Sequence, residues 1–123
     1  MMLPLLIAVA GGLGAVARFL LDGFIRAPVP SSYPVGTTLI NVSGSLLLGL
    51  VLGATVGRLL PETLQLVVGT GFLGGYTTFS TAAVETVALA QRRRWAAAVC
   101  NGLGMAVLAA AAAALGWWIG AQW

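Results

Sequence analysis

Histidine and lysine are absent from this sequence, and there is a single cysteine, Cys100. One cysteine excludes a disulfide within the chain, and the lack of histidine excludes the usual metal clusters of His and Cys. Only 7% of the residues are charged, whereas soluble domains carry about 25%. With neither paired carboxylates nor a Ser–base arrangement visible, the sequence does not predict an enzyme.

The few charges are unevenly placed along the chain. The net charge of +3 comes entirely from arginine, and three of the six arginines form one cluster, Arg92 to Arg94. A single cluster with scattered remaining arginines is not typical of a nucleic-acid-binding surface. We therefore expect no nucleic acid partner.

Apolar length is what the sequence has instead. Hydrophobic residues make up 59% of the chain and its mean hydropathy is +1.00. A helix needs about 20 apolar residues to cross a bilayer. The sequence predicts one all-α integral membrane domain over residues 1–123, multi-pass in the cell (inner) membrane. Its four expected spans lie roughly at residues 3–24, 35–57, 63–90 and 95–119. The first is expected to be a retained span, because it lacks the basic start of a signal peptide.

Three short linkers join the expected spans: RAPVPSSYP, GRLLPE and QRRRW. Four arginines fall in the first and third linkers, whereas only Arg58 falls in the second. This bias predicts that the first and third linkers are cytoplasmic and both termini are outside. Small residues such as Gly49 and Gly53 let helices approach closely, and there are more of them than four helices use. We therefore expect an oligomer, most simply a dimer.

The stretch GFLGGYTTFSTA, residues 71–82, places hydroxyl groups inside an otherwise apolar span. The adjacent glycines Gly74 and Gly75 weaken the helix there. A helix broken in mid-membrane frees backbone groups, and these must be buried in protein or line a wet cavity or an ion site. The alternative is a simple glycine kink with its hydroxyls bonded locally. The physical argument leaves both open.

A second polar stretch, GTTLINVSGSLLLG, lies in the second span. Thr37, Asn41 and Ser45 recur every four residues, so they share one helix face. Asn41 either lines a path for a polar ligand or makes an interhelical hydrogen bond that stabilises the bundle.

Three motifs in order resemble the Fluc fluoride channels, also called the CrcB family of fluoride exporters. They are GGLGAVARF (residues 11–19), GTTLINVSGSLLLG (residues 36–49) and GFLGGYTTFST (residues 71–81). The resemblance covers nearly the whole chain. It implies a fluoride-selective channel that lets fluoride leave the cell passively, built as a dual-topology, antiparallel dimer of four-helix subunits with the third helix broken.

The resemblance also implies roles for individual residues. Two fluoride paths are expected along the dimer interface, and each is lined by Asn41, Phe79, Ser80, Thr81 and Thr37. Hydroxyl and amide groups can donate hydrogen bonds to fluoride, and the positive edge of a phenyl ring can meet an anion.

Two further elements of the resemblance concern charge. A structural Na⁺ at the dimer centre is expected to be held by the backbone carbonyls of Gly74 and Thr77. Arg18 is expected to lie toward a vestibule.

The chain departs from the family pattern at one position. The family usually reads TTFSTF, and here Ala82 replaces the second Phe. One expected ring is therefore missing, and the arginine bias opposes insertion in both directions. The sequence leaves two possible partners: a second copy of this chain, or a homologous subunit with the opposite bias.

Two other functions are compatible with the sequence. A small multidrug-type proton-coupled antiporter needs a carboxylate deep in the bundle, and only Glu85 is a candidate. A non-transporting membrane scaffold would use the same polar residues only to join helices.

Overall fold

The computed structural model describes residues 1–28 and 33–123, and every regular element in those ranges is helical. The predicted all-α fold class is therefore confirmed for the described residues. The first predicted linker, residues 26–34, includes residues 29–32, which lie outside the described ranges.

Three helical stretches are long and apolar enough to cross a membrane, which makes this a multi-pass membrane protein. The first two are the continuous helices α1 (Met2–Arg26) and α2 (Val35–Val56). The third runs through α6 (Trp95–Val99), the π-helical turn η2 (Cys100–Gly104) and α7 (Met105–Ala121).

The remaining helical segment, between α2 and α6, is interrupted. It comprises α3 (Glu62–Leu64), the π-helical stretch η1 (Gln65–Leu73), α4 (Gly74–Tyr76) and α5 (Ser80–Gln91). Residues 77–79 between α4 and α5 are not helical. The interruption thus follows the glycines instead of falling on them, which corrects the sequence expectation: Gly74 and Gly75 are themselves part of α4.

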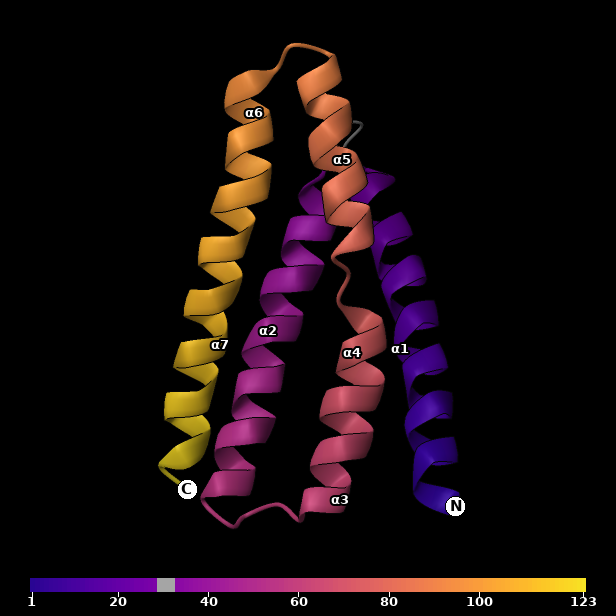
Figure 1. Ribbon diagram of the computed structural model, residues 1–123, viewed down its shortest axis with the longest axis vertical. Coiled ribbons are helices and arrows are strands. Elements are labelled where there is room, and N and C mark those ends of the chain that lie inside the picture. Colours follow the sequence, from indigo (N-terminus) through magenta and orange to yellow (C-terminus); the bar gives the residue numbers. More distant parts are fainter. Residues whose placement is uncertain (29–32) are drawn as a thin grey trace.

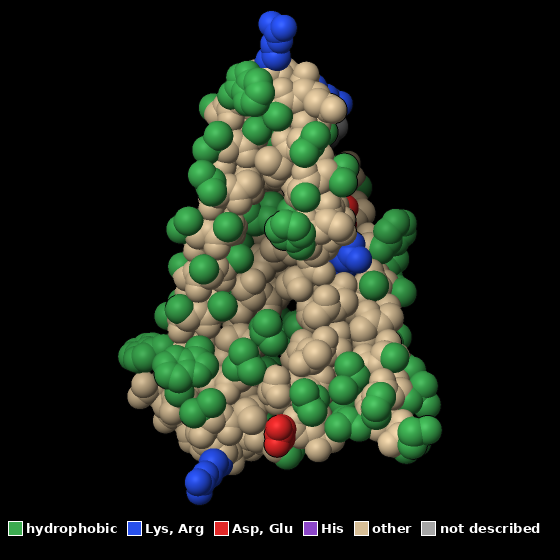
Figure 2. Space-filling model, in the orientation of Figure 1, with side chains coloured by type: hydrophobic (Ala, Val, Ile, Leu, Met, Phe, Trp, Pro, Cys, Tyr) green, Lys and Arg blue, Asp and Glu red, His purple; other side chains and the backbone are tan. Residues whose placement is uncertain are grey.

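Successive segments run in alternating directions along the long axis of the molecule, and both termini lie at the same end (Figure 1). The interruption between α4 and α5 lies about midway along that axis (Figure 1). Hydrophobic side chains are spread along the whole length of the face shown in Figure 2, with charged side chains at its two ends and a few more near mid-height along one edge. This distribution suits a molecule whose flanks face lipid.

Glycine allows the backbones of α2 and α7 to come into close contact. A Cβ built on Gly49 or Gly53 of α2 would collide with the backbone of α7, and one on Gly116 or Gly120 would collide with that of α2. Substitution at any of the four would push the helices apart. The small residues thus let the two backbones touch, as in other membrane helix pairs.

Glycines also let α1 pack closely against the interrupted segment. A Cβ on Gly14 would collide with the Phe72 carbonyl, and a Cβ on Gly75 would collide with the Gly11 carbonyl. Leu73 and Tyr76 of this segment form the buried core with Ile40 of α2. Packing from two sides therefore holds α4 in place immediately before the chain leaves its helical path.

Candidate functional site

The interruption begins where Thr77 adopts an extended conformation, with φ −80° and ψ 159°. The Thr77 amide still donates to the Leu73 carbonyl at 3.0 Å, and its hydroxyl donates to the same oxygen at 2.9 Å. Helical hydrogen bonding resumes when the Ala83 amide bonds to the Phe79 carbonyl. The backbone groups between these points need partners from elsewhere, because lipid supplies none.

Asn41 supplies two of those partners from α2. Its Nδ2 donates to the Thr78 carbonyl and its Oδ1 accepts from the Thr78 amide, each at 2.8 Å. Nδ2 also lies 3.1 Å from the sulfur of Met105. The buried Asn41 amide therefore replaces a helical neighbour for both backbone groups of Thr78.

The carbonyls of Gly74 and Thr77 are among those that lose their ordinary helical donors at the interruption. In an uninterrupted helix the Thr78 amide would bond to Gly74 and the Thr81 amide to Thr77. Instead, the Thr78 amide donates to Asn41, and the Thr81 amide donates to the Thr78 hydroxyl at 3.2 Å. Gly74 and Thr77 are the two residues whose carbonyls were expected to hold Na⁺.

A hard cation suits such oxygens. Na⁺ would use carbonyl groups without a helical donor as ligands, as other hard cations do. No group of three or more His, Cys, Asp and Glu residues could hold a metal ion within the described ranges, so side-chain ligands of those types do not compete. Carbonyl oxygens without a helical donor, as at Gly74 and Thr77, would be suitable ligands for such a cation.

Arg18 reaches the same region from α1. Its Nε donates to the Gly75 carbonyl at 3.3 Å, and the residue is partly buried. This places the guanidinium beside the last helical residues before the interruption. Arg18 was expected only to lie toward a vestibule, and its bond to Gly75 was not expected.

The expected path residues after the interruption lie at the start of α5. The Phe79 ring is 88% exposed, so almost nothing in this chain covers it. Ser80 is exposed and its hydroxyl lies 3.4 Å from that of Thr78, while Thr81 is partly buried. Phe79 is thus free to contact a ligand or another subunit.

A cavity of about 560 Å³ opens between the interruption, α2, α5 and the η2–α7 segment. Asn41, Thr77 and Phe79 of the predicted site line it together with Ala82 and Met105. Ser80, Thr81, Thr37, Gly74 and Arg18 do not line this cavity. Ala82, which stands where the family pattern has its second Phe, therefore lies on the cavity wall.

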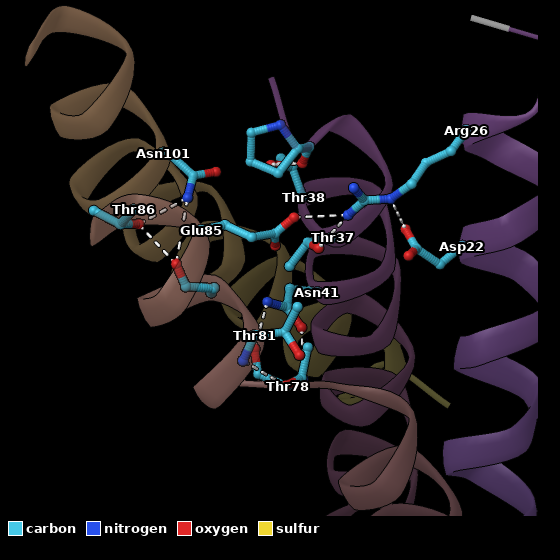
Figure 3. Close-up of polar contacts among 12 residues, drawn as sticks. Asp22, Arg26, Thr37, Thr38, Asn41, Thr78, Thr81, Glu85, Thr86 and Asn101 are labelled. Carbon is cyan, nitrogen blue, oxygen red and sulfur yellow. Dashed lines mark hydrogen bonds and ion pairs between the residues drawn. The ribbon is translucent and has the colours of Figure 1, made fainter. Parts of the chain in front are cut away.

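Thr37 lies at a cluster of charges one turn from Asn41 on α2. It is buried, with 2% of its surface exposed, and its hydroxyl accepts from Nη2 of Arg26 at 3.3 Å. Arg26 also bonds to Asp22 and Glu85 (Figure 3). Glu85 is therefore ion-paired, which argues against the free carboxylate that a proton-coupled antiporter needs.

Sequence reasoning did not select Asn101 as a site residue. It is 1% exposed and lines the cavity, and its Nδ2 donates to the Thr86 hydroxyl at 2.7 Å and to the Ala82 carbonyl at 3.5 Å. Its Oδ1 is buried without a partner in the described residues. The sequence signal that could have identified Asn101 was a polar amide side chain within an apolar span.

Comparison with known proteins agrees with the motifs. Residues 5–117 match the family described as CrcB-like protein, Camphor Resistance (CrcB). The chain is 56% identical over 116 residues to a protein of Leifsonia xyli named fluoride-specific ion channel FluC 1, covering 94% of this chain and 85% of the relative. It is 48% identical over 124 residues to FluC 2 of Cutibacterium acnes, covering 98% and 99%. The resemblance found in the sequence is confirmed, and the chain belongs to the CrcB-like protein family.

Proposed function

We propose that this chain is a subunit of a fluoride-selective channel that lets fluoride leave the cell passively across the inner membrane. The observation that carries the proposal is the Asn41–Thr78 pairing, in a chain whose relatives are named fluoride-specific ion channels. It keeps a non-helical segment in the middle of an apolar bundle, and such a segment is tolerated at membrane depth where it is buried in protein or lines a wet path. The subunit has four spans, with residues 62–91 forming the broken third.

Fluoride passes along polar groups close to the interruption. Thr37, Ser80 and Thr81 supply hydroxyl donors, the amide of Asn41 lines the path, and the exposed Phe79 supplies a ring edge. Replacing hydration water by several weak donors allows an ion to enter and also to leave. An exposed apolar ring in a membrane protein can face lipid or a second subunit, and the proposal places a second subunit beside Phe79.

Na⁺ is bound at the dimer centre by the carbonyls of Gly74 and Thr77. Support comes from the side-chain acceptors that take the amides of Thr78 and Thr81 away from these carbonyls. The bound cation supplies fixed positive charge and a partner for oxygens that the bilayer leaves without one.

The channel is an antiparallel dimer, either of two copies of this chain or of this chain and a homologous subunit. Four arginines lie at the end of the molecule that carries the α5–α6 connection, and Arg58 lies in the α2–α3 connection at the other. Asp22 and Glu85 compensate part of the first group. The remaining bias and Ala82 motivate a homologous partner with the opposite bias, because one chain then inserts each way, whereas a homodimer requires that the bias be weakly read and Ala82 tolerated.

Fluoride efflux from liposomes tests the function. The purified chain is reconstituted into vesicles loaded with potassium fluoride, and release is followed with a fluoride electrode, with potassium chloride as the matched control. A selective channel releases fluoride and retains chloride.

The same assay separates the partners and the scaffold alternative. Fast release by the chain alone supports a working homodimer. A silent but folded preparation that recovers activity with a co-expressed homologue supports a heterodimer. No release with any homologue overturns the proposal and favours a scaffold.

A further inference from the structure

A bridge of charged groups crosses the bundle from α1 to α5 (Figure 3). The guanidinium of Arg26 lies at its centre. Its Nε donates to Oδ1 of Asp22 at 2.8 Å, and its Nη2 donates to Oε2 of Glu85 at 2.7 Å. Asp22 lies one turn back on α1 and fixes the orientation of the guanidinium, so that Nη2 points at Glu85.

Glu85 is the more enclosed partner of the bridge. Its side chain is 17% exposed, against 45% for Arg26. The second carboxylate oxygen, Oε1, is buried and has no hydrogen-bond partner in the described residues. Without Arg26 the Oε2 atom would lose its bonded cation as well, and a largely enclosed carboxylate without a cation is unfavourable.

The same carboxylate borders the proposed fluoride path on two sides. Thr81 lies four residues before Glu85 on α5, so the two share a face. Thr37 accepts a hydrogen bond from the Nη2 that also binds Glu85. A fluoride ion moving between Thr81 and Thr37 therefore passes close to Glu85, and an uncompensated carboxylate would repel it.

Other charges do not replace Arg26 in this role. Arg92 lines a small cavity of about 100 Å³ together with Glu85, but no ion pair joins the two in the described part of the chain. Asp22 adds negative charge to the cluster. Arg26 is thus the cation that is bonded to Glu85.

We propose that Arg26 is a positioning residue for fluoride conduction: its guanidinium neutralises Glu85 and holds that carboxylate toward α1, so that fluoride can pass Thr81 and Thr37. The inference rests on the proposed channel function. Arg26 lies outside the three motifs, and in this proposal it compensates the charge of Glu85 that would otherwise repel fluoride. In a low-dielectric site one uncompensated charge is enough to slow an anion substantially.

The test compares fluoride efflux from liposomes for wild type, Arg26→Gln, Glu85→Gln, the double variant and Arg26→Lys. Arg93→Gln is the matched control, because it removes one arginine from the α5–α6 connection without any bond to Glu85. Size-exclusion elution reports whether each variant keeps its assembly.

We expect Arg26→Gln to lower the efflux rate by roughly tenfold or more. Efflux should return to near the wild-type rate in the double variant and be largely kept in Arg26→Lys and Arg93→Gln. The double variant separates two roles of Arg26. If the salt bridge is merely structural, the double variant lacks it too and its efflux stays low. If Arg26 compensates the charge of Glu85, removing Glu85 restores efflux.

Unchanged or faster efflux in Arg26→Gln, or no recovery in the double variant, overturns the inference. If Arg26→Gln does not fold, the comparison is between the double variant and Glu85→Gln. Their fluoride efflux rates should then be equal, and a clear difference between them also overturns the inference. A silent wild type overturns the proposed function instead, so the two failures are distinguishable.

Discussion

The side-chain amide of Asn41 pairs with both backbone groups of Thr78 at 2.8 Å, across 37 residues of sequence. The sequence left two roles open for Asn41, an interhelical hydrogen bond and a place beside a polar path. Asn41 forms the hydrogen bond between two helical segments, and it also lines the cavity beside the interruption. The pairing keeps the chain out of a helical path at residues 77–79 without leaving the Thr78 amide or carbonyl unsatisfied.

Replacing Asn41 by Ala should disrupt the interruption. Two backbone groups of Thr78 would lose their partners, at a cost of about 1–3 kcal/mol in the free energy of unfolding. We expect a lower thermal midpoint in detergent and a fluoride efflux rate reduced at least tenfold, that is about 1.4 kcal/mol in barrier. Ser45→Ala, one turn along the same face, is the control. Wild-type stability together with wild-type efflux in Asn41→Ala would contradict the prediction.

Phe79 offers a test in which function and stability separate. Because its ring is 88% exposed, Phe79→Ile should change the free energy of unfolding by less than about 0.5 kcal/mol. Fluoride efflux should nevertheless fall strongly, since isoleucine has no positive ring edge. Phe19→Ile is the control, because that ring is 78% exposed on α1. Equal efflux from the two variants would remove Phe79 from the path.

Gly75→Ala should destabilise the protein. The added methyl group would collide with the carbonyl of Gly11, and neither backbone can move without separating α1 from α4. We expect a loss of about 1–3 kcal/mol, as for other overpacked contacts. Gly12→Ala on α1 meets nothing within 4 Å and should be neutral or slightly stabilising. Thermal unfolding of the two variants in the same detergent measures the difference.

Exchange of Na⁺ for N-methylglucamine should lower the thermal midpoint. A ligand present at 100 times its dissociation constant stabilises the folded state by about 2.7 kcal/mol. Thr78→Val should raise the Na⁺ concentration that gives half of this stabilisation. In that variant the Thr81 amide loses its hydroxyl acceptor and becomes available to the Thr77 carbonyl. Identical unfolding curves in the two salts would argue against a bound Na⁺.

Several features of the fold follow from local properties of the sequence. Low charge and long apolar runs predict membrane helices, because the bilayer requires internally hydrogen-bonded backbone. The paired glycines and the hydroxyl run marked the region of the interruption. They did not determine its position, since Gly75 is held in α4 by its contact with Gly11, and Asn41 then captures the amide of Thr78.

The contacts that shape the candidate site were less accessible from sequence. Arg26 and Glu85 are 59 residues apart, and nothing in the composition of either segment pairs them. The π-helical stretches η1 and η2 were likewise not expected, and neither was the partly buried bond between Asn101 and Thr86. Such contacts depend on which helix faces meet.

The sequence by itself determined the all-α membrane class, the family and the residues that carry polar chemistry in an apolar chain. These depend on residue type and on spacing along one segment, which a single chain displays directly. The tertiary structure alone decided which carbonyls lack a helical donor, where the chain leaves the helix and which cation compensates Glu85. The Thr78 amide and the Glu85 carboxylate take partners on other helices, Asn41 and Arg26, and only packing brings those partners within reach.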